Sequence, residues 1–366
     1  MTDDIFDHDV LFIPGPVEVR REILDAQGGW MIGHRSKAFA DLYARLQPKL
    51  KEAFFVGDGY RVYIYTSSGS GIWESASRCC VRDDQPVLHL VNGAFSERWA
   101  GVSRENGKQV DVLEVPWGQA VKPEQLADAL KQKHYDAVAV VYNETSTGVI
   151  NPLPQYAEIM RGYPDTLFLV DAVSCWLGAE LDTAAWGIDL VVTSSQKCFA
   201  LPPGIAFGAV SDRVLARAKE IPYRGYYFDV LTLEKHHEKN NTPATPPISL
   251  MYAADRQLDA IRAEGYANRF RRHAQMAGMV RAWVERQGFA MFSEEGYHSP
   301  TVSTVRNTRS IDFPALQAHL KKQHITLGGG YGKLKDETFR IAHMGDAQPA
   351  HIERLLSAMD AFLAQA

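Results

Sequence analysis

The sequence predicts an α/β fold with a mostly parallel, doubly wound sheet, followed by a second and smaller α+β unit. Short apolar runs rich in β-branched residues alternate with segments of helical spacing from residue 61 to residue 192. After residue 204 this alternation stops, and two long helical segments lead into a region with strands and helices of its own. The 366 residues also exceed what one ordinary core accommodates, which favours two domains.

Three segments follow from these changes of pattern. Residues 1–18 are expected to form an N-terminal arm, because the stretch Pro14–Pro16 cannot be helical. Residues 19–262 are expected to form the large domain and residues 263–366 the small C-terminal domain.

The expected elements follow in chain order. In the large domain we expect strands at 61–65, 86–92, 110–115, 137–142, 166–170 and 188–192, with a return strand at 205–210. We expect helices at 37–55, from about 72, up to 104, and at 123–133, 154–163, 249–262 and 266–287. Segment 223–229 is expected to be irregular, segment 233–241 is polar, and segment 241–247 is expected to be extended because of its prolines. In the small domain we expect strands at 301–306 and 338–342, helices at 314–323 and 349–363, and a glycine-rich loop at 328–330.

Composition restricts the class of protein. The chain is 46% hydrophobic and 23% charged with a net charge of −5, which is typical of a globular protein and argues against a nucleic-acid or membrane surface. The first ten residues lack the pattern of a secretory signal, and no apolar run reaches the length of a membrane span. The four cysteines form no CxxC pair and no disulfide framework. We therefore expect a reducing, cytoplasmic setting.

Unusual residues gather where the predicted strands end. Because the carboxyl ends of parallel strands meet at one edge of a sheet, ligands bind there. The residues at these ends are Ser68, Gly69, Ser70, Phe95, Thr145, Asp171 and Lys197.

Lys197 is a single cation between small polar residues and an apolar run. Burying an unpaired ammonium is costly, unless the amine is neutral or covalently capped. A Schiff base with an aldehyde cofactor satisfies both conditions. The alternative is a surface lysine whose stem lies along the loop.

Pyridoxal phosphate is the cofactor whose requirements these residues meet together. Its aldehyde needs Lys197, and its ring nitrogen needs a carboxylate such as Asp171. Its other contacts would come from Ser68, Gly69 and Ser70 for the phosphate, Phe95 for the ring face, and Thr145 or Gln196 for the phenolic oxygen. Taken singly, Asp171 could be a helix cap and Phe95 an ordinary core residue.

With these residues assigned, nearly the whole chain resembles the class V pyridoxal-phosphate-dependent aminotransferases, close to the alanine–glyoxylate and serine–pyruvate enzymes. The matching segments keep the order and spacing of that family. They are PGP at 14–16, GHRS at 33–36, SSGSG at 67–71, NGAF at 92–95, NETSTG at 143–148, VDAVS at 170–174, SQKC at 195–198, TPPIS at 245–249 and FRIAHMG at 339–345.

The resemblance implies fold type I and a homodimer with active sites at the subunit boundary. It implies that Lys197 forms the Schiff base and then carries protons, and that Arg340 grips the substrate carboxylate. Thr242 and Thr245 match the segment that reaches the cofactor phosphate of the partner subunit. The implied reaction is transfer of an amino group from a small amino acid, alanine or serine, to glyoxylate or pyruvate. The chain departs from the pattern at Phe95, often tryptophan in relatives, and at Ser70-Gly71, where some relatives have histidine.

Other functions were weighed against this resemblance. A cysteine desulfurase needs a nucleophilic cysteine in the C-terminal part, and no cysteine follows Cys198. A phosphoserine aminotransferase needs further basic groups, for which His34 and Arg35 are candidates, and an aspartate-type enzyme stays open. A non-catalytic relative is disfavoured by the joint presence of Lys197, Asp171 and Arg340. We expect no metal site, because the adjacent pair His236 and His237 lies in a polar stretch.

Overall fold

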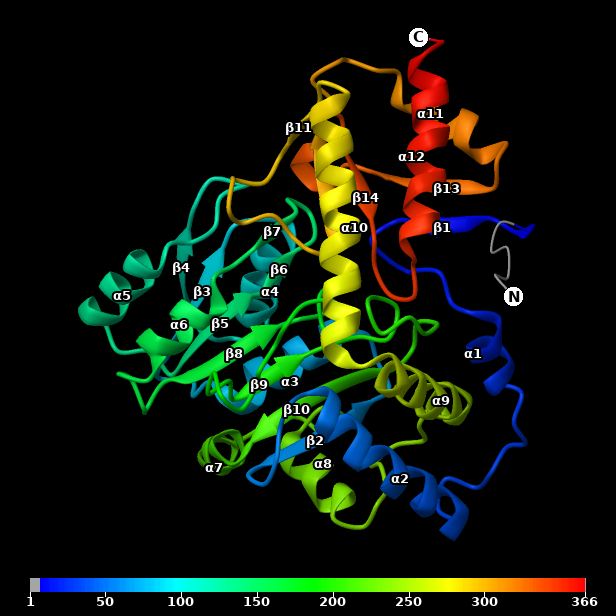
Figure 1. Cartoon of the computed structure of the whole chain (residues 1–366). Coiled ribbons are helices and arrows are strands. Elements are labelled where there is room, and N and C mark those ends of the chain that lie inside the picture. Colours follow the sequence, from blue (N-terminus) through cyan, green and yellow to red (C-terminus); the bar gives the residue numbers. More distant parts are fainter. Residues whose placement is uncertain (1–6, 366) are drawn as a thin grey trace.

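The structure is a computed structural model that describes residues 7–365 (Figure 1). The expectations for residues 1–6 of the N-terminal arm therefore lie outside the described residues. Figure 1 shows a large sheet with helices on both faces and a smaller part beside it, with the long helix α10 (Tyr266–Arg286) between the two.

The large sheet has seven strands and confirms the predicted α/β class. Six strands run in the same direction, and β10 is antiparallel to both of its neighbours, so it is the expected return strand. The strand order is β2 (Tyr60–Tyr65), β10 (Ala206–Ser211), β9 (Leu190–Val192), β8 (Leu167–Asp171), β5 (Ala137–Val141), β3 (Pro86–Val91) and β4 (Gln109–Glu114). The central strands are buried along their whole length, which explains their continuous apolar runs.

Helices cover both faces of this sheet and form two apolar clusters with it. The helices are α1 (Arg21–Ala26), α2 (Lys37–Ala53), α3 (Gly69–Cys80), α4 (Ala94–Glu105), α5 (Pro123–Gln132), α6 (Leu153–Met160), α7 (Asp212–Glu220), α8 (Val230–His237) and α9 (Ile248–Glu264). A two-stranded hairpin, β6 (Asn143–Glu144) with β7 (Val149–Ile150), follows β5.

The small sheet has five strands in the order β1 (Val10–Phe12), β13 (Ile325–Gly329), β14 (Thr338–Ala342), β12 (Val302–Arg306) and β11 (Ala290–Met291). Its apolar cluster is shared with α10, α11 (Phe313–Lys321) and α12 (Pro349–Leu363). Because β1 pairs with β13, the N-terminal arm is tied to the small sheet. The boundaries at residues 18 and 262 stay predictions.

Several local expectations were wrong. Helix α3 begins at Gly69 rather than near residue 72, because the chain turns directly at Ser68. Helix α8 lies in a polar stretch for which no helix was expected, and the Asp229 carboxylate caps it by accepting from the Leu231 N–H at 3.2 Å. Gly328 and Gly329, expected in a loop, complete strand β13.

Within residues 7–365, no helix combines the length and apolar character that a membrane crossing requires.

Candidate active site

The loop that follows β9 holds Lys197. Backbone and side-chain bonds fix this loop: Ser195 N–H donates to the Ile205 carbonyl at 3.0 Å, and the Ser195 hydroxyl donates to the Pro202 carbonyl at 2.7 Å. The Lys197 amine donates to the carbonyl of Pro14, in the N-terminal arm. Gly15 packs against this amine, since a Cβ there would lie 2.6 Å from Lys197 Nζ. Lys197 is therefore held between the large sheet and the arm.

The surroundings of Lys197 disfavour its charge. Burial lowers the pKa of Lys197 to about 8, and the positive charge of Arg340 lowers it further, while Asp171 acts in the opposite sense. A lysine with such a pKa is partly a free amine near neutral pH, as a nucleophile must be.

Asp171 ends strand β8, next to β9 in the sheet. Its carboxylate is 3% exposed and accepts two hydrogen bonds, from Trp73 Nε1 at 2.7 Å and from Val173 N–H at 2.7 Å. Burial raises the pKa of Asp171 to about 7, although both hydrogen bonds lower it. Such a carboxylate is stabilised by any cation that comes to it, for example a protonated ring nitrogen.

The turn between β2 and α3 carries Ser68, Gly69 and Ser70. Ser68 is the N-cap residue, but its hydroxyl makes no capping bond, and both serines are exposed. Gly69 is buried, and a Cβ there would lie 2.6 Å from Val173 Cγ2, so only glycine lets the helix start so close to β8. The first N–H groups of α3 and two serine hydroxyls are thus available to an anion.

Phe95 lies in the first turn of α4, and the buried Glu144 holds this turn. The Glu144 carboxylate accepts from the N–H groups of Phe95 at 3.3 Å and Ser96 at 2.9 Å, and from the Ser146 hydroxyl at 2.6 Å. Thr145, next to Glu144, is 4% exposed. The position of Phe95 is therefore set by a carboxylate at a helix N-terminus.

Gln196 immediately precedes Lys197. Its amide oxygen accepts from the Ser194 hydroxyl at 2.5 Å. Gln196 is half-buried, and its carbonyl accepts from the Val17 N–H at 3.2 Å, which again joins the loop to the N-terminal arm.

Arg340 reaches the site from β14 of the small sheet. It is 9% exposed, and its Nε donates to the Gly329 carbonyl at 2.9 Å. In the part of the chain that the structure describes, no carboxylate forms an ion pair with Arg340. Burial lowers its pKa to about 10, although Tyr331 and Glu144 raise it. The charge of Arg340 contributes to the low pKa of Lys197. The two cations therefore repel each other within the candidate site.

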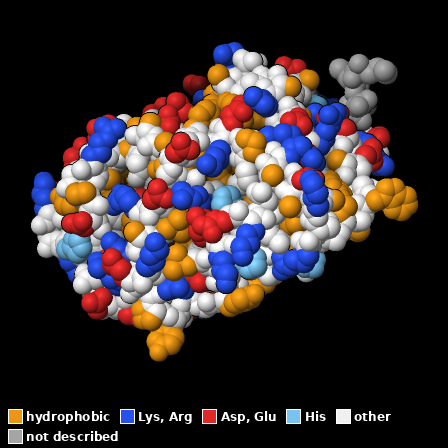
Figure 2. Space-filling view, turned by 90° about the horizontal axis from the view of Figure 1, so that it is seen from below, with side chains coloured by type: hydrophobic (Ala, Val, Ile, Leu, Met, Phe, Trp, Pro, Cys, Tyr) orange, Lys and Arg blue, Asp and Glu red, His pale blue; other side chains and the backbone are white. Residues whose placement is uncertain are grey.

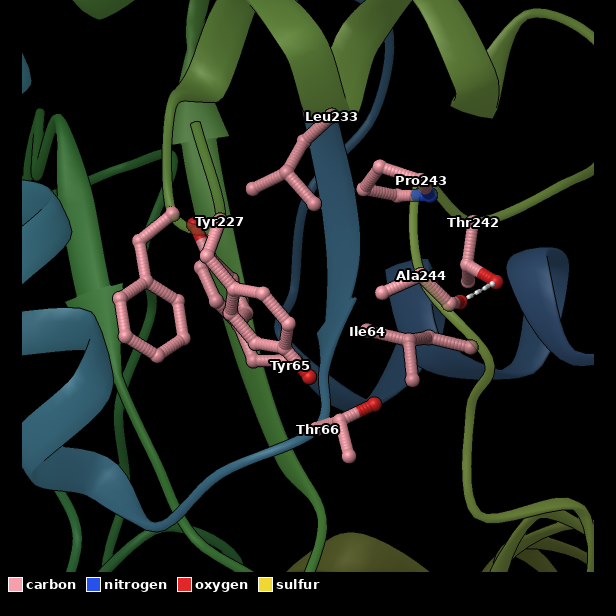
Figure 3. Close-up of a pocket in the computed structure, with 9 residues that line it drawn as sticks. Ile64, Tyr65, Thr66, Tyr227, Leu233, Thr242, Pro243 and Ala244 are labelled. Carbon is pink, nitrogen blue, oxygen red and sulfur yellow. Dashed lines mark hydrogen bonds between the residues drawn. The ribbon is translucent and has the colours of Figure 1, made fainter. Parts of the chain in front are cut away.

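Thr242 and Thr245 lie elsewhere, in the extended segment after α8. Thr242 is buried and its hydroxyl donates to the Ala244 carbonyl at 2.8 Å, whereas Thr245 is exposed. Figure 3 shows Thr242, Pro243 and Ala244 lining a pocket together with Thr66 at the end of β2 and Tyr227. Arg35 holds this segment through the Thr242 carbonyl at 2.6 Å.

Three residues at the site carry no signal of their own in the sequence: Trp73, Glu144 and Tyr331. From the sequence, Trp73 and Tyr331 could equally be core or surface residues, and Glu144 is only one position of the segment NETSTG at 143–148. Their contacts join segments far apart in the chain, such as Trp73 with Asp171.

Metal binding has no support in the described chain. Across residues 7–365, no group of three or more histidine, cysteine or acidic side chains is placed to hold an ion. His237 instead shares a hydrogen bond with the Tyr43 hydroxyl at 3.0 Å.

Comparisons with known proteins identify the family of the chain. The family model for aminotransferases of class V matches residues 23–332. An uncharacterised aminotransferase of Methanocaldococcus jannaschii is 36% identical over 92% of this chain and 88% of its own length. An L-aspartate–glyoxylate aminotransferase of Paracoccus denitrificans is 30% identical over 93% of this chain and 87% of its own. Among solved structures, an alanine–glyoxylate aminotransferase from Nostoc superposes with a TM-score of 0.91 and 28% identity, covering 97% of this chain and 95% of that one.

Proposed function

The chain belongs to the class V aminotransferase family, and on that basis we propose that it transfers an amino group from a small amino acid, alanine or serine, to glyoxylate or pyruvate by a ping-pong mechanism. The observation that carries this proposal is the unpaired, buried guanidinium of Arg340 beside the low-pKa amine of Lys197. A guanidinium binds a carboxylate in a two-pronged fork, and every 2-amino and 2-oxo acid presents one.

The donor set fits pyridoxal phosphate by its chemistry. When bound, this cofactor supplies an aldehyde that accepts the amino group and a ring that withdraws electrons from the substrate α-carbon. Lys197 would hold the aldehyde, and Asp171 would keep a proton on the ring nitrogen. The turn residues Ser68, Gly69 and Ser70 would hold the phosphate.

The remaining cofactor contacts would come from three residues. Phe95 would cover one face of the ring, and Thr145 or Gln196 would donate to the phenolic oxygen.

Two residues would act on the substrate itself. Arg340 would bind and orient its carboxylate. Lys197 would carry the proton that leaves the α-carbon, because its lowered pKa lets it accept and return a proton near neutral pH. The arm segment at Pro14 packs on this amine and excludes water from it.

The choice of small substrates rests on how other cations are engaged. A dicarboxylic donor needs a second cation for its distal carboxylate. Arg35 is bound to Asn241 Oδ1 at 2.6 Å, Arg224 to Asp229 Oδ1 at 2.7 Å, and Lys333 lies 3.8 Å from Glu97 Oε2. Because these three cations have partners, we expect aspartate and glutamate to be poorer donors than alanine or serine.

We further propose a homodimer with shared active sites, in the cytoplasm. Trp30 is 94% exposed and Tyr223 97% exposed, which is unusual for side chains of this size. Figure 2 shows a face on which positive and negative side chains alternate and single hydrophobic side chains project. In such a dimer, Thr242 and the exposed Thr245 would reach the cofactor phosphate of the partner subunit.

A panel of amino acids against glyoxylate, pyruvate and 2-oxoglutarate tests the proposal, with Lys197→Ala as the inactive control. We expect alanine or serine with glyoxylate or pyruvate to be the fastest pair. A wide preference for 2-oxoglutarate, or for aspartate as the Paracoccus relative's name indicates for that protein, would overturn the small-substrate part alone. A purified protein that neither binds pyridoxal phosphate nor transfers amino groups would overturn the whole proposal.

A further inference from the structure

Tyr331 lies between the two halves of the candidate site. Its ring stacks on the Phe95 ring, with centroids 5.2 Å apart and an interplanar angle of 17°. The guanidinium carbon of Arg340 lies 5.2 Å from the centroid of the same Tyr331 ring. Tyr331 therefore connects the residue proposed to cover the cofactor with the residue proposed to bind the substrate carboxylate.

The Tyr331 ring is itself held in place. Its hydroxyl accepts a hydrogen bond from Arg98 Nη2 at 2.6 Å, and the Arg98 guanidinium carbon lies 5.8 Å from the Tyr331 ring centroid. Arg98 follows Phe95 by one turn of α4, so both groups that hold Tyr331 in this way come from one helix of the large domain.

The backbone on either side of Tyr331 is equally constrained. A Cβ at Gly330 would collide with the Leu334 carbonyl, and Gly332 has a φ of +57° at a place where an added Cβ would lie 3.4 Å from Trp117 Cη2. Lys333 extends over the Trp117 ring at 4.9 Å from the centroid. The loop 330–335 is thus fixed against the large domain by contacts that do not involve Tyr331.

We propose that Tyr331 is a positioning residue of the reaction: it holds the Arg340 guanidinium in the orientation that receives the substrate carboxylate. This inference rests on the proposed function. Within residues 7–365, the hydrogen bond of Arg340 runs from Nε to the Gly329 carbonyl and its two terminal NH₂ groups make none, so a single bond holds the guanidinium plane. The electron-rich face of the tyrosine ring attracts the cation and supplies a second point of contact. The same Tyr331 ring packs on Phe95. It therefore fixes the position of the Arg340 guanidinium relative to the Phe95 ring.

The experiment compares Tyr331→Leu, Tyr331→Phe and a matched control, Lys335→Ala, in the holoenzyme. Propionate serves as the probe, because it has the carboxylate of alanine but no amino group to transfer. Its Kd is measured by calorimetry, and KM and kcat are measured for the fastest donor and acceptor. Thermal unfolding of each variant reports whether the fold is retained.

We expect Tyr331→Leu to weaken propionate binding about tenfold and to raise both KM values by a similar factor, with kcat changed by less than about threefold. Tyr331→Phe keeps the ring and loses only the bond to Arg98, so its Kd should stay within about threefold of wild type. Lys335→Ala should leave both readouts near wild type, because Lys335 is an exposed residue of the same loop.

Two results would overturn the inference. One is a Tyr331→Leu variant whose propionate Kd and KM values match those of the wild type. The other is an equal loss in Tyr331→Leu and Tyr331→Phe, which would assign the effect to the hydroxyl rather than to the ring. Should Tyr331→Leu fail to fold, Tyr331→Met takes its place, because it also removes the aromatic face and should give the same tenfold loss of propionate binding. A wild type that neither binds propionate nor transfers amino groups would instead refute the proposed function.

Discussion

Replacing Arg340 by methionine removes the guanidinium charge from the candidate site while keeping most of the length of the side chain. Arg340 is 9% exposed, donates one hydrogen bond from Nε to Gly329, and pairs with no carboxylate among residues 7–365. The incoming substrate carboxylate would therefore be its only charged partner.

The size of the effect follows from these surroundings. Two unit charges 4 Å apart attract by about 4 kcal/mol at an effective dielectric constant of about 20. Truncating one partner of a buried charge pair costs about 2–5 kcal/mol, so kcat/KM should fall by roughly 30- to 3,000-fold. The loss should be similar in both half-reactions, because donor and acceptor present the same carboxylate. Stopped-flow measurement of each half-reaction with purified protein gives the two values separately.

The same substitution should stabilise the substrate-free fold. Burial lowers the pKa of Arg340 from 12.5 to about 10, so the folded state binds this proton less tightly than the unfolded state does. The charge therefore reduces stability at all pH values below about 10, and this cost fades as the pH rises from 10 to 12.5. We expect Arg340→Met to have a higher Tm than wild type at pH 7, by an amount that shrinks above pH 10.

Arg306→Met is the matched control, since Arg306 is an exposed arginine on the neighbouring strand β12. It should leave both kcat/KM and Tm near wild type. The reasoning is refuted if Arg340→Met keeps kcat/KM within about threefold in both half-reactions, or if it lowers Tm while the control does not.

Three further predictions follow from other residues of the site. In the cofactor-free protein, Lys197→Met should raise Tm at pH 7, because burial disfavours the charged amine below its pKa of about 8. The gain in Tm over wild type should shrink between pH 8 and 10.5, and a gain that stays the same across this range would contradict the prediction. Asp171→Asn should weaken cofactor binding and cut turnover by about 10²- to 10⁴-fold, measured by absorbance titration and steady-state rates, and unchanged turnover would mean that another acid holds the ring nitrogen. Mixed dimers of Lys197→Ala and Thr245→Glu should recover roughly a quarter of wild-type activity, since half of the reassorted dimers carry one intact site, whereas no recovery in exchanging dimers would place Thr245 away from the partner's site.

The large sheet was predictable because its physical cause is local. Strands buried on both faces, such as β5 and β8, must be apolar along their whole length, and the sequence pattern carries this directly. Strand β1 has three residues and pairs with β13 more than 300 residues later, so no local pattern could indicate it. Helix α8 was not predicted, because its polar residues gave no indication of a helix that Asp229 could cap.

The residues of the candidate site also fall into two groups, those that local pattern predicts and those that only long-range contacts bring together. Lys197 and Asp171 follow strands, so their neighbourhood could be predicted from topology alone. The indole of Trp73 reaches Asp171 across 98 positions, and Tyr331 reaches Phe95 from the loop that follows β13. The first contact depends on how α3 packs on the large sheet and the second on how the small sheet docks on the large one, and no window of sequence contains either.

This docking depends on a buried ionic cluster around Asp346. Its carboxylate accepts from Arg20 Nε at 2.7 Å and from Arg269 Nη1 at 2.9 Å, which joins the start of α1 and α10 to the loop that follows the Arg340 strand. Burial opposes ionisation of Asp346, but the charges of Arg269 and Arg20 lower its pKa to about 2. The stability that Asp346 contributes is therefore present above its usual pKa near 4 and is lost only as the pH falls toward 2. Lys197 and Asp171, with pKa values of about 8 and 7, change charge near neutral pH instead. The cofactor-free protein should therefore change charge in the candidate site between about pH 5 and 9, while the relation of the two sheets stays constant.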